Sequence, residues 1–164
     1  FEHIVKSFGP KVVLDEVSCD PGDEIRLRFH SKCDIACNGD YTMLGDGVGN
    51  MALIPVSDTG TSFEENRHAV QRIREETDFQ WIPYFDAVMT ADSGTTVTAS
   101  IILPVDDDSE AAGITRSAEI VHAGDDTLTV RFAYRDRRYT YTWRGGAGSG
   151  DGLALADAEV TDIR

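Results

Sequence analysis

The stretch KVVLDEVSCDPGDEIRLRFHS, residues 11–31, decides the fold class. Its first run, Val12 to Val17, is mostly apolar, and the polar segment 18–23 follows. In residues 24–29 apolar and charged side chains alternate strictly. A period of two is typical of a strand with one buried face. We therefore expect two strands joined by a short turn, which is a β-hairpin.

The same period recurs along the chain, with turn residues between the runs. The further strand candidates are MALIPVS (51–57), FDAVMTA (85–91), TTVTASIILPV (95–105), SAEIVHA (117–123), TLTVRFAY (127–134) and RRYTYTW (137–143). DSG at 92–94 and GDD at 124–126 are turn signals. About ten to thirteen short strands without a βαβ pattern predict an all-β fold, an antiparallel two-sheet β-sandwich.

Some segments leave alternatives open. Ser62 and Glu65 resemble a helix capping box, but Val70 and Ile73 are too few for an apolar stripe, so a strand is favoured over a helix in 62–76. Residues 153–160 suit a last strand or a short helix. We expect loops at 38–50, at the acidic segment 106–113 and at the glycine-rich segment 145–152.

The length of 164 residues predicts one β-sandwich domain over 1–164, because no linker-like segment divides the chain. The N-terminal sequence FEHIVKSFGP lacks an initiator methionine and a signal-peptide pattern. We interpret the chain as a fragment or a processed form of a longer protein. No run approaches the roughly 20 apolar residues of a membrane helix, so no membrane partner is expected.

Charge narrows the possible partners. Fifteen basic residues face 29 acidic ones, which gives a formal net charge of −14. Such a surface repels nucleic acid, anionic membranes and free uronic or sulfated polysaccharides at long range. Screening beyond about 8 Å still allows a local arginine cluster to bind an anion. We expect no nucleic-acid partner.

The three cysteines Cys19, Cys33 and Cys37 are an odd number and do not suggest a disulfide framework. His30 with Cys33 and Cys37 suggests a metal trio, but a structural zinc site requires four ligands. Half-buried thiols are the preferred interpretation, and neither a metal nor another cofactor is expected.

No catalytic motif is present, neither a nucleophile elbow nor a phosphate-binding loop. His3, His30, His68 and His122 lie in or beside expected strands, where hydrogen-bonded structural histidines are common. We expect Asp15 to cap a turn or to accept backbone N–H groups, because an unpaired buried carboxylate is costly.

Two groups of residues are candidates for substrate binding. Arg67, His68 and Arg72 could contact a carboxylate-bearing sugar, or pair with surface acids. Trp81 and Tyr84 lie in DFQWIPYFD (78–86), where exposed rings would mark a contact surface. Trp143 belongs to an aromatic row with Tyr139 and Tyr141, which suits stacking on sugar rings but is favoured as core.

The residues 2–31, EHIVKSFGPKVVLDEVSCDPGDEIRLRFHS, resemble the segment that follows the catalytic part of heparinase II/III-like polysaccharide lyases. In that family a strand reading roughly "yvvvDrv" precedes a polar turn and a strand ending in "fH", here Val12 to Val17 and Phe29–His30. MALIPVS resembles a later apolar strand, and Ile101–Pro104 resembles a "tvlyP" element. The resemblance spans most of the chain.

The resemblance implies the C-terminal β-sandwich of a lyase whose N-terminal part is an (α/α) toroid. Family lyases cleave uronic-acid-containing polysaccharides by β-elimination. The family's catalytic Asn and Tyr lie on the toroid, and its catalytic His and metal ligands precede the "vvvD" strand. No catalytic residue is therefore carried over to this chain. The implied partner is the toroid of the same parent protein, in the periplasm or outside the cell.

Two functions from different classes follow. The first is a non-catalytic module that supports the toroid and shapes its substrate cleft. The alternative is an independent carbohydrate-binding module with exposed aromatic residues as its sugar platform. Exposed, coplanar rings would favour the second function.

Overall fold

The structure is a computed structural model that describes residues 9–46, 49–71, 79–92, 94–122, 127–145 and 153–163, with 67–71 and 79–81 described by their backbone alone. The elements are β1 Lys11–Ser18, β2 Glu24–His30, β3 Asp34–Asn38, β4 Tyr41–Gly45, β5 Asn50–Ser57, β6 Thr61–Gln71, β7 Phe79–Thr90, β8 Thr95–Val105, α2 Asp108–Ser117, β9 Glu119–His122, β10 Thr127–Tyr134, β11 Arg137–Arg144 and β12 Ala154–Asp162. Twelve strands and one helix in this part of the chain confirm the all-β class.

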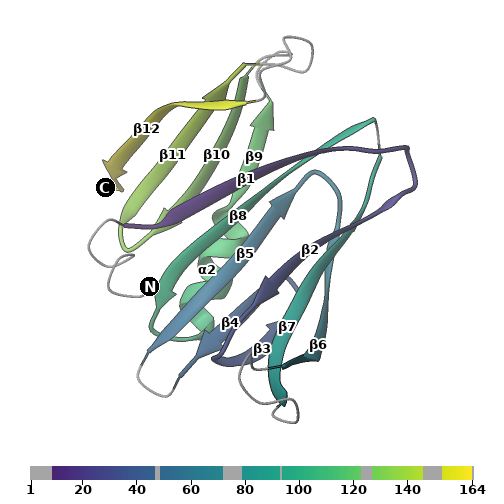
Figure 1. Cartoon of the computed structure of the whole chain (residues 1–164). Coiled ribbons are helices and arrows are strands. Elements are labelled where there is room, and N and C mark those ends of the chain that lie inside the picture. The colour runs from purple at the N-terminus through teal and green to yellow at the C-terminus, as the bar shows by residue number, and fades with distance from the viewer. Residues whose placement is uncertain are drawn as a thin grey trace.

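The strands form three antiparallel sheets. Sheet A has the order β1-β8-β5-β4-β3, sheet B the order β2-β7-β6, and sheet C the order β12-β11-β10-β9. Sheet C lies beside sheet A, and sheet B continues from the other side of sheet A (Figure 1). This sandwich-like packing agrees with the architecture expected from the sequence.

The main core lies between sheets A and C. Alternate residues of β8, among them Ala99, Ile101 and Leu103, are fully buried on the face of sheet A that meets sheet C. Val130 and Phe132 of β10 oppose them and are at most 1% exposed. These apolar residues recur at every second position because consecutive strand residues point to opposite faces.

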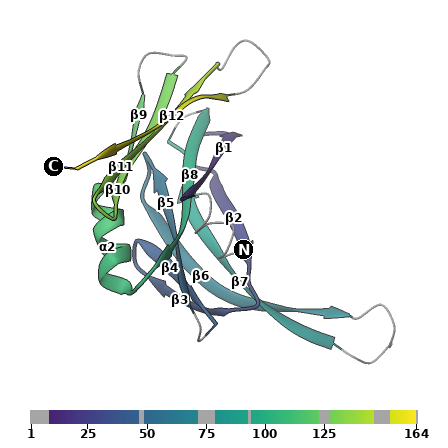
Figure 2. The same cartoon turned by 90° about the vertical axis from the view of Figure 1, so that its left-hand side faces the viewer.

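The expected hairpin at residues 11–31 is wrong. β1 pairs with β8 from Lys11↔Ile102 to Ser18↔Thr95, whereas β2 pairs with β7 from Glu24↔Thr90 onwards. The two halves of the stretch therefore belong to different sheets. Together with β8 and β7 they form one long ribbon that bends between sheets A and B (Figure 2).

Backbone hydrogen bonds hold the bend between the two sheets. Gly22 N donates to Ala91 O at 2.8 Å, and Ala91 N donates to Asp23 O at 2.9 Å. Gly22 has a φ of +94°, a conformation that glycine adopts without steric cost. Around the bend, Val17 and Cys19 pack against Ile25, Met89 and Ala91. The polar turn seen in the sequence is thus a corner between sheets and not a hairpin loop.

Residues 106–113 were expected to be an exposed acidic loop, and this is wrong. Helix α2 begins there, with Asp107 as its N-cap: the carboxylate of Asp107 accepts from Glu110 N at 2.9 Å. Glu110 in turn accepts from the backbone N–H of Asp106, the residue before the N-cap, at 2.7 Å, in an arrangement close to a capping box. Ala111 and Ile114 are at most 2% exposed and close one end of the core against β10 and β4.

Other segments follow the sequence more closely. The favoured strand is confirmed for 61–71, and the strand is the alternative found at 154–162. β9 pairs with β10. The segment 38–50 is not all loop, because β4 lies within it. The turn 124–126, residues 72–76 and most of 145–152 lie outside the described residues.

Asp15 neither caps a turn nor accepts a backbone N–H group within the described part of the chain, so both expectations for it are wrong. It lies inside β1, opposite Thr98 of β8, and is half-buried. Burial raises the pKa of its carboxyl above the usual value of 3.8. Nothing in the described part of the chain is a helix long and apolar enough to cross a membrane.

Candidate functional site

Tyr84 of β7 is the sequence candidate whose side chain has the best defined surroundings. Across the ribbon it is paired with His30 of β2 and with Asn66 of β6. The Arg28 guanidinium carbon lies 4.2 Å from the centre of the Tyr84 ring, a cation–π distance. The His30 ring lies 5.7 Å from it. Arg28 therefore covers one face of the Tyr84 ring.

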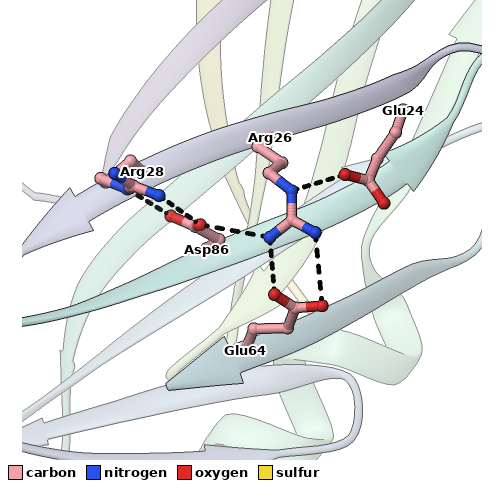
Figure 3. Close-up of polar contacts among 5 residues, drawn as sticks. All are labelled: Glu24, Arg26, Arg28, Glu64 and Asp86. Atoms are coloured by element: carbon pink, nitrogen blue, oxygen red, sulfur yellow. Dashed lines mark hydrogen bonds and ion pairs between the residues drawn. The ribbon is translucent and has the colours of Figure 1, made fainter. Parts of the chain in front are cut away.

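An ion-pair network lies next to Tyr84 on the same face of sheet B. Figure 3 shows its residues, which are Glu24, Arg26, Arg28, Glu64 and Asp86. Arg28 Nε and Nη2 donate to the two carboxylate oxygens of Asp86, each at 2.8 Å. Arg26 donates to Glu24 and to Glu64, each at 2.6 Å. Arg26 Nη1 also lies 3.5 Å from Asp86 Oδ2, which joins the two halves of the network.

The charges of this network compensate one another. Asp86 is 2% exposed, and the hydrogen bonds from Arg28 hold the pKa of its carboxyl below the usual 3.8 although burial acts in the opposite direction. Hydrogen bonds to Glu64 and Glu24 raise the pKa of Arg26. Two guanidiniums face three carboxylates, so the network has no spare positive charge for an anionic ligand.

The other candidates of this group lie on the β6–β7 ribbon near Tyr84. The backbone register places Arg67 opposite Pro83 and His68 opposite Ile82. Trp81 stands opposite Ala69 in the same ribbon. Arg72 lies outside the described residues. The structure thus brings the backbones of Arg67, His68 and Trp81 to the strand pair that carries Tyr84.

Trp143 is separate from this group. It is only 7% exposed and packs in the core between sheets A and C, 6.1 Å from the Tyr141 ring. Tyr139 and Tyr141 stack on Phe132 at centroid distances of 5.2 and 6.2 Å. The core interpretation of the aromatic row is therefore confirmed, and Trp143 offers no exposed ring to a sugar.

The free cysteines and histidines do not form a site in the described part of the chain. Cys19, Cys33 and Cys37 are free and half-buried, as expected. Across the described ranges no group of three or more His, Cys, Asp or Glu residues is arranged to hold a metal ion. His122 Nε2 lies 2.7 Å from Asp58 Oδ2 at the surface, which ties the end of β9 to the loop after β5.

A feature that the sequence analysis missed is a hollow on the outer face of sheet C. Its volume is about 450 Å³. Its polar lining includes Glu119, Arg131, Arg138, Thr140, Glu159 and Thr161. The alternation in 127–134 and 137–143 places these residues opposite the core positions, but only the order of β9 to β12 brings them together.

Comparison with known proteins gives no relative for this fold or site. No family model, no curated protein and no solved structure matches the chain.

Proposed function

We propose that this chain is the non-catalytic C-terminal β-sandwich of a heparinase II/III-like polysaccharide lyase, which supports a catalytic (α/α) toroid and its substrate cleft. The observation that carries the proposal is the placement of the resembling segments. Val12 of β1 pairs with Ile101 of β8, and Ile101 pairs with Ile54 of β5. Three of the four motifs that share the family pattern thus lie on neighbouring strands of sheet A, and the fourth, Phe29–His30, lies on β2 of sheet B.

The described aromatic and charged side chains also support this proposal, because they contact other residues of the protein. Trp143 is part of the core, and Arg28 covers one face of the Tyr84 ring. Asp86 is held by two arginines within sheet B. These groups stabilise the sandwich itself. The alternative of a carbohydrate-binding module with an aromatic platform has no support from Tyr84 or Trp143.

Lyase assays of the isolated chain and of the parent protein test this proposal. β-Elimination produces an unsaturated uronate, which absorbs in the ultraviolet. We expect no new absorbance when the 164-residue chain is mixed with heparin, heparan sulfate or alginate. We expect the preceding coding sequence to encode an (α/α) toroid whose lyase activity falls when this chain is deleted.

Three outcomes contradict the proposal. Turnover by the isolated chain would show that it is itself an enzyme. A parent gene without a toroid, or a toroid whose activity and solubility do not change on deletion, would remove the supporting role. Retardation of the isolated chain by neutral glucans in affinity electrophoresis would instead favour an independent carbohydrate-binding module.

A further inference from the structure

The hollow on the outer face of sheet C is built from two rows of cross-strand neighbours. One row runs Glu119–Arg131–Thr140–Glu159 across the four strands of the sheet. The next row runs Ala133–Arg138–Thr161. Directly opposite residues of antiparallel strands share a face, so both rows turn away from the core that contains Phe132 and Tyr139.

The arginines of the hollow differ from Arg28 and Arg135 in their partners. Arg28 and Arg135 are held by carboxylates at 2.8 to 3.2 Å. In the hollow, Arg131 is 3.9 Å from Glu119 and 46% exposed. Arg138 is exposed, and its guanidinium makes no hydrogen bond or ion pair within the described part of the chain. This guanidinium is therefore available to a ligand.

The lining combines donors and acceptors that suit a ligand with both a carboxylate and hydroxyl groups. A guanidinium binds a carboxylate through two parallel hydrogen bonds. The carboxylates of Glu119 and Glu159 accept hydrogen bonds from hydroxyl groups, and the hydroxyls of Thr140 and Thr161 both donate and accept. Two guanidiniums and two carboxylates make the hollow neutral overall, so a bare anion such as phosphate meets as much repulsion as attraction.

From this lining we infer that the hollow binds an acidic sugar, a uronate residue, with its carboxylate on Arg138 and its hydroxyls between Glu119, Glu159 and the threonines. A neutral sugar leaves Arg138 without a partner, and a simple anion leaves both glutamates facing a negative charge. The volume of about 450 Å³ falls within the range of about 300–1,000 Å³ of small-ligand pockets. The inference deepens the function proposed above and rests on it for the polysaccharide that would carry the uronate, whereas the position of the site rests on the residues of sheet C.

The test is a titration of the 164-residue chain in about 0.15 M salt, where the long-range repulsion from its net charge of −14 is screened, followed by calorimetry or by NMR shifts. The probes are a short oligoglucuronate, a glucose oligomer of equal length and inorganic phosphate. We expect binding of the oligoglucuronate alone. We expect Arg138→Gln to weaken that binding by roughly 10- to 100-fold, because it removes a charge-assisted hydrogen-bonded pair.

Arg137→Gln is the matched control. Arg137 is the preceding residue of the same strand, its register partners are Tyr134 and Asp162, and it does not line the hollow. Both variants remove one positive charge, and thermal unfolding verifies that both are folded. Failure of wild type to bind the oligoglucuronate, equal binding of phosphate or glucan, or equal weakening by the two variants would each overturn the inference.

Discussion

Arg28 of β2 and Asp86 of β7 stand directly opposite each other on the outer face of sheet B, and two parallel hydrogen bonds of 2.8 Å join their side chains. The Asp86 side chain is 3% exposed, whereas that of Arg28 is 48% exposed. The carboxylate thus depends on its arginine partners for the hydrogen bonds that water would otherwise supply. Asp86 is therefore the residue of this network whose ion pairs should contribute most to the stability of sheet B.

Asp86→Asn should destabilise the protein. The amide keeps the size of the side chain but cannot accept both hydrogen bonds from the guanidinium. A hydrogen bond to a charged group contributes about 1.5–3 kcal/mol to stability. We expect the free energy of unfolding in urea to fall by about 1–3 kcal/mol. Glu64→Gln is the control, because Glu64 is 57% exposed and its pair should contribute less than about 1 kcal/mol. Equal losses in both variants would contradict the central role of Asp86.

The contribution of Asp86 should vanish in acid. Hydrogen bonds from Arg28 hold its folded-state pKa below 3.8, so the unfolded chain takes up the proton first as the pH falls. Its stabilisation is fully present above about pH 4 and is lost as the pH falls through the folded-state pKa. We expect the difference in unfolding free energy between wild type and Asp86→Asn to narrow steadily below that pH. A constant difference from neutral pH to strongly acidic pH would show that the loss is not electrostatic.

Asp15 should show the opposite dependence on pH. Burial raises its folded-state pKa above 3.8, so the folded protein holds this proton more tightly than the unfolded chain does. The contribution of protonated Asp15 to the free energy of unfolding is present below the unfolded-state pKa and is lost as the pH rises through the folded-state pKa. Asp15→Asn, which stays neutral, should therefore gain stability relative to wild type as the pH rises from about 3 to 6. A difference in unfolding free energy between wild type and Asp15→Asn that stays constant across this pH range would refute the effect.

The sequence predicts strand positions well because the alternation of apolar and polar residues is local. Ile25, Leu27 and Phe29 indicate their strand without reference to any partner. Pairing is not local: Val12 meets Ile101, a residue far along the chain. The adjacent β1 and β2 were therefore assigned to one hairpin, although each pairs with a strand formed much later in the sequence.

The site was predicted less completely for the same reason. Tyr84 was recognised by its residue type, but its partner Arg28 comes from another strand, and the contact changes the role of the ring. The hollow around Arg138 requires the order of four strands, which no single run of sequence contains. Helix α2 was missed because most of its side chains are polar, although Asp107 and Glu110 carry a capping signal.

The N-cap of α2 can be tested by Asp107→Ala. The carboxylate of Asp107 satisfies the backbone N–H of Glu110, which has no partner within the helix. Replacement of an N-cap aspartate by alanine costs about 0.5–2 kcal/mol. We expect a loss of this size in urea unfolding and nearly full recovery in Asp107→Ser, which restores a side-chain acceptor. If alanine and serine at this position gave the same stability, the cap would not contribute.

Two buried hydroxyl groups on β8 should contribute to the stability of the protein with opposite signs. Ser100 is 0% exposed, and its Oγ has no hydrogen-bond partner in the described part of the chain. Thr98, two residues earlier and 1% exposed, donates from Oγ1 to Val56 O at 3.2 Å. An unsatisfied buried polar group costs about 1–3 kcal/mol, whereas a satisfied hydroxyl contributes about 1 kcal/mol.

Ser100→Ala should therefore leave the protein as stable as wild type or stabilise it by about 1 kcal/mol, because the lost oxygen had no partner. Thr98→Val keeps the shape of the side chain but loses the bond to Val56 O, so it should destabilise the protein by about 1 kcal/mol. Urea unfolding of both variants gives the comparison directly. A clear loss of stability in Ser100→Ala would mean that the Ser100 hydroxyl has a hydrogen-bond partner in solution, such as a buried water molecule. Water would then enter sheet A beside β8.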